Sequence, residues 1–178
     1  MKRVFAPIIL LLLAANTFAQ VKNTVTKSAI TFQIKNLGIN TGGRLAGLQA
    51  NILFDPAQLN ASVIEATADA NTINTDNDTR DTHLKSEEFF DVARFPKISM
   101  KSVSFKHKSS DNYTGQFNII MKDRTKQIEV PFTYTETGNT ATFKGSFKLN
   151  RTDFGVGSKS MVLSSDVTVN IELETTKS

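Results

Sequence analysis

Cysteine is absent from the 178-residue chain, and histidine occurs only twice. The absence of cysteine excludes a lipid-modified N-terminal cysteine, a disulfide framework and a thiolate metal site. His83 and His107 lie on different predicted elements, without carboxylates at the spacing of a metal motif. We therefore expect no metal site and no cofactor.

Patterns for binding phosphate or nucleic acid are missing as well. The 21 basic residues are scattered along the chain among 17 acidic ones. Gly42-Gly43 and Gly155-x-Gly157 adjoin predicted strands with no helix following, which indicates turns rather than phosphate-binding loops. Aromatic residues share strand faces with aliphatic residues, so we expect them to point inward rather than form a platform for bases. No nucleic-acid partner is expected.

Only one stretch is long and apolar, the run Phe5–Ala15. It follows Lys2-Arg3 and precedes Thr17-Phe18-Ala19, which together form the pattern of a secretory signal peptide. The run is shorter than the roughly 20 residues that span a bilayer. We therefore predict a signal peptide over residues 1–19.

Cleavage before Gln20 would export the remaining domain, residues 20–178, so we predict a periplasmic or secreted location. Loss of Lys2 and Arg3 leaves 19 basic and 17 acidic residues, a net charge of +2. No other stretch approaches the length of a membrane span, so we expect no stable membrane insertion.

Phenylalanine is abundant, with 13 residues, and lies in segments that alternate apolar and polar positions. Such alternation is typical of strands with one buried face. Three glycines indicate a loop over residues 36–43, and Asp55-Pro56 ends the second strand. The alternation predicts eight strands, near residues 25–35, 45–54, 61–70, 97–107, 113–121, 128–134, 141–149 and 167–173.

Short connections between these strands favour antiparallel neighbours. Eight antiparallel strands form either a barrel or a sandwich, and a barrel leaves no exposed edge. Ala66, Ala68 and Ala70 leave room on the apolar face of the third strand. We predict an all-β fold with a short helical insertion, built as an eight-stranded antiparallel β-barrel, a size that encloses space for one ligand.

One polar stretch, residues 77–91, interrupts the strand pattern. Residues 76–85 offer several N-caps and few β-branched residues, which predicts two or three helical turns. An enzyme would use Asp81 to orient His83 as a base, but residues i and i+2 point to different faces of a helix, and no recognisable nucleophile accompanies them. We predict no enzymatic activity, and interpret Arg80 and Asp81 as candidates for buried or semi-buried ion pairing.

The apolar strand faces converge on an interior that has two interpretations. A small barrel can be filled by its own side chains, or it can hold a greasy ligand in a cavity. Burial of a hydrocarbon chain contributes about 0.8 kcal/mol per CH₂, so such a cavity needs no charged group to bind tightly. Residue types alone leave both interpretations open.

A family resemblance favours the cavity. The chain resembles the YceI-like family over nearly all of the exported part, in order. The most specific run is Arg80-Asp81-x-His83-Leu84-Lys85-Ser86-x-x-Phe89-Phe90-Asp91-Val92. The other matching runs are Phe54-Asp55-Pro56, Ala66-Thr67-Ala68-Asp69, Asn74-Thr75-x-Asn77, Phe95-Pro96-x-Ile98, Gly115-x-Phe117-x-Ile119, Thr125-Lys126, Pro131 and Phe147-x-Leu149-x-Arg151-x-Asp153-Phe154-Gly155. At Met121-Lys122-Asp123 the chain lacks the glycine usual in the family, a difference confined to a turn.

The resemblance implies a lipocalin-like antiparallel β-barrel whose apolar tunnel holds a polyisoprenoid, an isoprenoid quinone or a similar amphiphile. It also implies a periplasmic, often stress-associated protein without enzymatic activity. The apolar wall positions carried over as ligand-binding residues are Phe32, Ile34, Ile52, Phe54, Phe89, Phe90, Phe117, Ile119, Phe132, Phe147, Leu149 and Phe154.

We therefore interpret the chain as an exported lipid-binding protein that sequesters or carries such a ligand. Two alternatives remain: a secreted lipid-modifying enzyme with Asp81 and His83 at the tunnel mouth, and a filled barrel that acts as a protein-interaction module. The headgroup, the chain length, the delivery partner and the oligomeric state, a homodimer included, stay open.

Overall fold

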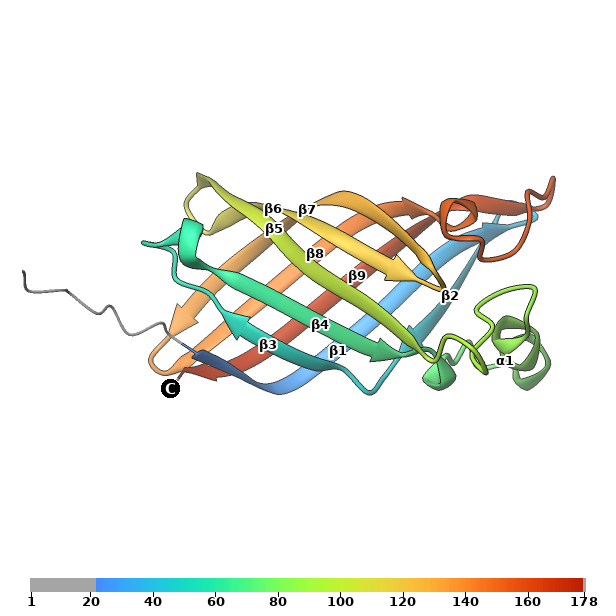
Figure 1. The fold of residues 1–178 in the computed structure, drawn as a ribbon, viewed down its shortest axis with the longest axis horizontal. Coiled ribbons are helices and arrows are strands. Elements are labelled where there is room, and N and C mark those ends of the chain that lie inside the picture. The colour runs from blue at the N-terminus through green and yellow to red at the C-terminus, as the bar shows by residue number, and fades with distance from the viewer. Residues whose placement is uncertain (1–21, 178) are drawn as a thin grey trace, which may run out of the picture.

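The computed structural model describes residues 22–177, and the predicted signal peptide lies outside them. The chain forms strands almost throughout, with one α-helix and three short 3₁₀ turns (Figure 1). In order, the elements are β1 (Lys22–Asn36), β2 (Ile39–Leu45), β3 (Gln49–Leu53), η1 (Leu59–Ala61), β4 (Val63–Asp69), η2 (Ala70–Thr72), α1 (Asp78–Lys85), β5 (Lys97–Ser109), β6 (Asn112–Met121), β7 (Arg124–Thr137), β8 (Thr140–Asn150), η3 (Arg151–Phe154) and β9 (Leu163–Lys177).

The sheet closes on itself because β1 pairs on one side with β9 and on the other with β2 and β3. Strands β2 and β3 pair with β1 in the same register. Ile30 faces Leu45 of β2, and Asn23 faces Ile52 of β3, so the step back along β1 equals the step forward from β2 to β3. They therefore act as a single broken strand. All neighbours are antiparallel, so the predicted eight-stranded antiparallel barrel is confirmed.

The predicted loop over residues 36–43 is wrong. Leu37 and Gly38 form a tight turn, and β2 begins directly after it. Gly43 does not mark a turn: a Cβ placed there would lie 2.4 Å from Cζ of Phe32 and 2.8 Å from Cγ2 of Thr75. The glycine therefore serves close packing inside a strand, which a local pattern cannot distinguish from a turn.

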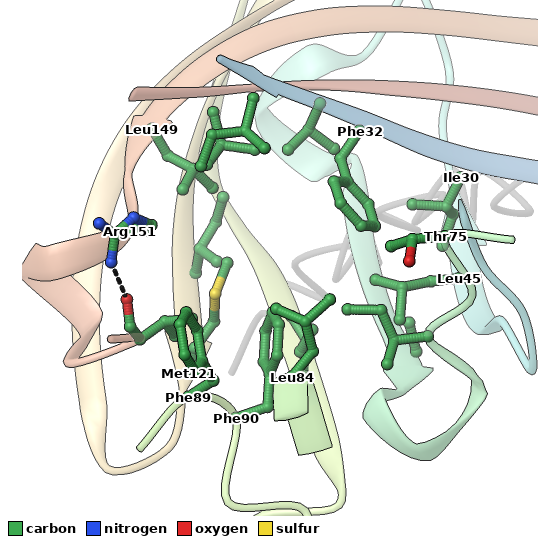
Figure 2. A pocket seen from close by; sticks show the side chains of 18 of the residues that line it. Ile30, Phe32, Leu45, Thr75, Leu84, Phe89, Phe90, Met121, Leu149 and Arg151 are labelled. Carbon is green, nitrogen blue, oxygen red and sulfur yellow. Dashed lines mark hydrogen bonds between the residues drawn. The ribbon is translucent and has the colours of Figure 1, made fainter. Parts of the chain in front are cut away.

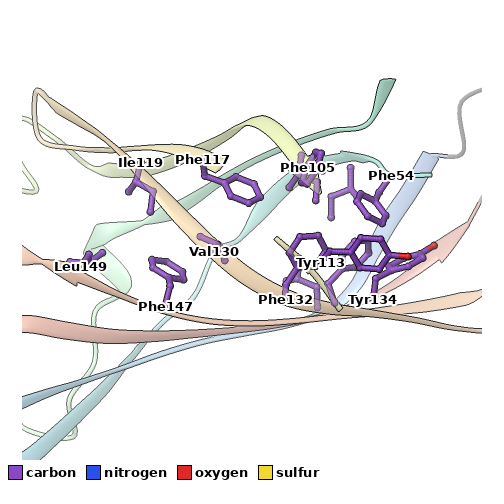
Figure 3. Close-up of a cluster of buried hydrophobic side chains, with 14 of the residues drawn as sticks. Phe54, Phe105, Tyr113, Phe117, Ile119, Val130, Phe132, Tyr134, Phe147 and Leu149 are labelled. Atoms are coloured by element: carbon purple, nitrogen blue, oxygen red, sulfur yellow. The ribbon is translucent and has the colours of Figure 1, made fainter. Parts of the chain in front are cut away.

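Aromatic rings fill the half of the barrel that contains both ends of the described chain (Figure 3). Phe54, which is almost fully buried, lies at the centre of this cluster. Its ring packs edge-on, at centroid distances of 4.8–5.7 Å, against Phe105, Tyr113, Phe132, Tyr134 and Phe143. Such edge-to-face contacts stabilise a core beyond simple burial, and they close this end of the barrel.

Among residues 22–177, no helix combines the length and the apolar character that crossing a bilayer requires. The same part of the chain holds no group of three or more histidine, aspartate or glutamate side chains suited to a metal ion.

Candidate functional site

Helix α1 lies at the opposite end of the barrel from the aromatic cluster (Figure 1). Asn77 begins it as N-cap, since its side chain accepts a hydrogen bond of 2.9 Å from the Arg80 N–H. Asp78 and Asp81 in the first turn and Lys85 in the last complement the helix dipole. The predicted helix is confirmed, although its length of 8 residues makes it dependent on tertiary contacts.

Thr75 anchors α1 to the chain that precedes it. Its hydroxyl donates to Oδ1 of Asp81 at 2.6 Å, and its N–H donates to the same oxygen at 2.9 Å. Arg80 donates from Nε to the Thr75 hydroxyl and from Nη2 to the Thr75 carbonyl, both at 2.7 Å. Arg80 and Asp81 are thus joined through Thr75 by hydrogen bonds, and within residues 22–177 neither forms the expected ion pair.

The segment after α1 turns two phenylalanines into the barrel (Figure 2). The Phe90 N–H donates to the Leu84 carbonyl at 3.0 Å, which folds the segment back on the helix. Leu84, Phe89 and Phe90 all line the open space inside the barrel. The structure thus places Phe89 and Phe90 at the cap end of this space, and their contact with a ligand stays a prediction.

Two contacts join this segment to the loop after β8. The Gly157 N–H donates to the Glu88 carbonyl at 2.9 Å. The Lys122 ammonium, from the β6–β7 turn, donates to the carbonyls of Glu87 at 3.1 Å and Gly155 at 3.2 Å. Residues 78–90, which we call the cap, are therefore held over the barrel end by polar contacts to two neighbouring loops.

His83 does not pair with Asp81. Its Nε2 lies 2.9 Å from Oε2 of Glu88, and its ring packs edge-on against Phe89 at 4.9 Å. Asp81 instead faces Thr75. The base-and-orienter arrangement that an enzyme would need is therefore not formed by these two residues, as expected from their i, i+2 spacing.

Arg151 is buried at the cavity wall and is bonded to neutral groups. Its guanidinium donates to the carbonyls of Ser164 at 2.9 Å, Val156 at 2.8 Å, Ser158 at 2.8 Å and Leu163 at 3.3 Å. Burial lowers the pKa of Arg151 from its ordinary value. These four hydrogen bonds hold the loop between β8 and β9 against the guanidinium.

Close approach to this guanidinium requires glycine in the loop. Gly157 has a φ of +65°, and a Cβ there would lie 2.6 Å from Nη1 of Arg151 and 2.8 Å from Cε1 of Phe89. The Gly155-x-Gly157 pattern is thus a turn, as predicted, and it serves both the arginine and the cap.

The space between the cap and the aromatic cluster is a cavity of about 560 Å³. Ala66 and Ala68 contribute short side chains to its wall, so the room expected on the third predicted strand is present. Its apolar wall also includes Ile30, Phe32, Ile34, Leu48, Ile98, Met100, Ile119, Met121, Phe147, Leu149, Val167, Val169 and Ile171. The volume lies within the range of small-molecule sites.

Polar residues gather at the cap end of the cavity. The ionisable members are Arg80, His83, Glu88, Arg151 and Lys159. Lys159, Ser160 and Val162 line the cavity and are also exposed, so it reaches the surface beside the loop before β9. The site is therefore amphipathic, with an apolar interior and a polar mouth of mainly positive charge.

The twelve predicted wall residues divide into those that line the cavity and those that do not. Five lie outside the cavity lining, packed in the buried core: Ile52, Phe54, Phe117, Phe132 and Phe154. Seven line the cavity: Phe32, Ile34, Phe89, Phe90, Ile119, Phe147 and Leu149. The interior is therefore filled by side chains around the aromatic cluster and open beside the cap, so each of the two interpretations describes a part of it.

Several site residues were not predicted. Thr75 stands in a family run, but its bonds to Arg80 and Asp81 follow only from the folded chain. Lys159 has no local pattern that marks it. Met100 and Met121 line the cavity from alternating strands, and the alternation could have identified them. Arg151 stands in the family run, but its burial follows only from the folded loop.

Relatives of the chain share part of their length with it. A UPF0312 protein of Yersinia enterocolitica is 30% identical over 111 residues, which is 62% of this chain, and the match spans only 57% of that relative. A UPF0312 protein of Pseudomonas paraeruginosa is 30% identical over 135 residues, covering 71% of this chain and 70% of the relative.

Solved structures share the fold. BcnA of Burkholderia cenocepacia superposes with a TM-score of 0.79 at 20% identity, covering 83% of this chain and 95% of BcnA. A polyisoprenoid binding domain from Saccharophagus degradans, implicated in plant cell wall breakdown, gives a TM-score of 0.69 at 13% identity, covering 89% and 99%.

The model of the YceI-like domain matches residues 22–175, nearly the whole described barrel. The matched range includes the cap, the cavity wall and the Arg151 loop. The chain belongs to the YceI-like family.

Proposed function

We propose that the protein is an exported carrier that holds one long-chain amphiphile, such as a polyisoprenoid or an isoprenoid quinone, without chemically changing it. The observation that carries this proposal is the 560 Å³ cavity, whose walls are apolar and whose polar residues lie at the mouth. Its chemistry matches a molecule with a hydrocarbon tail and one polar end.

The tail would lie between the cap and the aromatic cluster, with Phe147 and Leu149 on one wall and Ala66 and Ala68 on another. Each buried CH₂ contributes about 0.8 kcal/mol. Each isoprene unit contains several carbons, so a few units provide strong binding without a charged contact.

The headgroup would lie at the mouth, near Lys159 and Arg151. Lys159 is exposed and makes no hydrogen bond or ion pair within residues 22–177. Glu88, the one acidic residue of the lining, already contacts His83. A headgroup rich in acceptor oxygens suits this surplus of positive charge.

Two further observations support the proposal. The Saccharophagus degradans domain that shares this fold is a polyisoprenoid binding domain. The signal pattern of residues 1–19 would deliver the barrel to the periplasm or medium. There, a molecule of low solubility needs a carrier to cross water.

Mass spectrometry of an organic extract tests the proposal. The chain from Gln20, which includes every described element, is purified and extracted with chloroform and methanol. We expect an isoprenoid, quinone or acyl species in near-stoichiometric amount, or stoichiometric uptake of added polyprenol or quinone by stripped protein. Neither native ligand nor uptake, in protein whose thermal unfolding is cooperative, would refute the carrier function.

A second experiment tests export. Fractionation of cells expressing the full chain should place it in the periplasm or medium, with Gln20 as the N-terminal residue. Retention of Lys2 and Arg3 on cytoplasmic protein would refute export and would leave the binding proposal standing.

A further inference from the structure

Exposed apolar side chains gather beside the cavity mouth. Leu37 and Ile39 of the β1–β2 hairpin are each 71% exposed, and Met161 and Val162 precede β9, with Met161 fully exposed. The Leu37 N–H donates to the Val162 carbonyl at 2.8 Å, which joins the two loops. We call these four residues the rim patch. Figure 1 shows both loops at the α1 end of the barrel.

The rim patch is continuous with the cavity. Val162 belongs to both, and its neighbours Lys159 and Ser160 also line the mouth. Ile34 and Asn36, which precede the hairpin turn, line the cavity from the other side of the patch. A molecule that leaves the cavity through this mouth therefore passes directly over exposed apolar side chains.

Leu37 has a backbone conformation that is strained for a leucine. Leu37 has a φ of +51° and Gly38 one of +78°, a turn geometry that favours Asn-Gly. The first central residue of each other tight hairpin turn in residues 22–177 is polar or glycine: Ser110, Lys122 and Gly138. A leucine in this position is strained and exposed, so the core gains nothing from it.

The two loop segments that carry the rim patch have charges of one sign. Residues 35–43 and 154–165 contain Lys35 and Lys159 and no acidic residue. Both lysines are exposed, and neither ammonium group makes a hydrogen bond or ion pair within the described part of the chain. Apolar side chains on loop tips, flanked by free lysines, fit a fluid hydrocarbon surface beneath anionic headgroups.

We propose that the rim patch docks the barrel reversibly on an anionic lipid bilayer, with the cavity mouth facing the membrane. This proposal rests on the proposed carrier function, since docking places the mouth where a long-chain ligand enters and leaves. The docking is peripheral and needs no spanning segment. Leu37 and Met161 enter the headgroup region, while Lys35 and Lys159 contact the anionic headgroups.

Vesicle sedimentation tests the docking. The chain from Gln20 is used because the apolar run 5–15 would itself bind lipid. We expect it to sediment with vesicles of phosphatidylcholine and phosphatidylglycerol, and more weakly with phosphatidylcholine alone or at high salt. The double variant Leu37→Asn/Met161→Asn should reduce the partition coefficient about tenfold, because binding scales with apolar contact area.

Val103→Asn is the matched control. Val103 is 53% exposed, but it lies on the barrel wall beside a β-bulge of β5. Its replacement should leave vesicle binding unchanged. Leu37→Asn should also leave the fold intact, because asparagine tolerates positive φ better than leucine.

Lys35→Gln measures the contribution of charge. Lys35 does not line the cavity. Its replacement should weaken binding to phosphatidylglycerol vesicles and leave binding to phosphatidylcholine unchanged. Equal wild-type affinity for the two kinds of vesicle would refute the preference for an anionic surface.

Failure to sediment with either kind of vesicle, or equal binding by the rim double variant, would refute docking. Docking would also be refuted if the protein does not bind vesicles but forms a dimer in solution that the rim substitutions dissociate. Extractable ligand should stay at the wild-type level in the rim variants. A protein that docks but never contains or takes up ligand would refute the carrier function alone, and a protein that contains ligand but does not dock would refute docking alone.

Discussion

Thr75 and Asp81 share two hydrogen bonds at one oxygen: the Thr75 hydroxyl lies 2.6 Å, and the Thr75 nitrogen 2.9 Å, from Oδ1 of Asp81. Both residues are buried. Since Arg80 also bonds to Thr75, the first turn of α1 is fixed to the chain before it at this one place. The position of the cap over the cavity therefore depends on a short polar network.

Asp81→Ala should loosen the cap. The substitution leaves the Thr75 N–H without its acceptor, and an unsatisfied buried group costs about 1–3 kcal/mol. Hydrogen exchange of residues 78–90 should accelerate, while the strands of the aromatic half stay protected. Asp78→Ala removes an exposed carboxylate from the same helical turn and is the control. Equal exchange in the two variants would show that the Thr75 contact does not hold the cap.

Arg151→Met should destabilise the whole barrel. The carbonyls that now accept from the guanidinium, one buried and three part-buried, would lose their donor, at a cost of about 3 kcal/mol. Urea denaturation measures the change in the free energy of unfolding. Arg44→Met is the control, because Arg44 and its ion-pair partner Asp76 are both exposed. A loss as small as that of the control would show that the loop does not depend on Arg151.

Much of this fold follows from local pattern. The period of two in a strand separates inner from outer residues, so the alternation of Ile128, Val130 and Phe132 predicts their common face. The same pattern does not predict where along the barrel axis an inward-facing residue lies. Phe132 and Phe147 have equivalent patterns, yet Phe132 lies in the aromatic cluster and Phe147 lines the cavity.

Contacts between distant segments account for the rest. Gly43 in a strand is explained by Phe32 and Thr75, which approach it from other segments. The buried charge of Arg151 depends on carbonyls that only the folded loop brings together. Such features lie beyond any local period, because tertiary packing decides them.

Glu136 makes the stability of the barrel dependent on pH. Tyr134 donates to its carboxylate, and Lys177 forms an ion pair with it. Burial raises the pKa of Glu136, but the hydrogen bonds from Lys177 and Tyr134 outweigh burial, so the pKa lies below the ordinary value of 4.5. A lowered folded-state pKa contributes stability that is present above the unfolded-state pKa and is lost as pH falls through the folded-state pKa.

The free energy of unfolding of the wild type should therefore exceed that of Glu136→Gln at neutral pH, and the difference should shrink below about pH 4.5. Urea denaturation at several pH values measures it. Glu129→Gln is the control, because Glu129 accepts from neutral Gln116 at 2.8 Å. A difference that stays constant down to pH 3 would contradict the lowered pKa.

Ala66→Phe should exclude the ligand from the cavity while keeping the cavity wall apolar. Ala66 lines the cavity, so a phenyl ring there would occupy space that the ligand tail needs. The added ring is apolar and enters existing space, so the cost should not exceed the roughly 1–3 kcal/mol that overpacking costs in a filled core. We expect the ligand content of an organic extract, relative to protein, to fall far below the wild-type level.

Ala29→Phe is the matched control, since Ala29 is exposed on β1 and the same ring would point away from the interior. Its ligand content should equal that of the wild type. Ala66→Phe with full ligand content and a cooperative unfolding transition would mean that the tail lies elsewhere. Loss of ligand in both variants would implicate folding or expression instead of space in the cavity. Only loss confined to Ala66→Phe assigns the ligand to the cavity, because the two variants differ in which side of the barrel wall receives the ring.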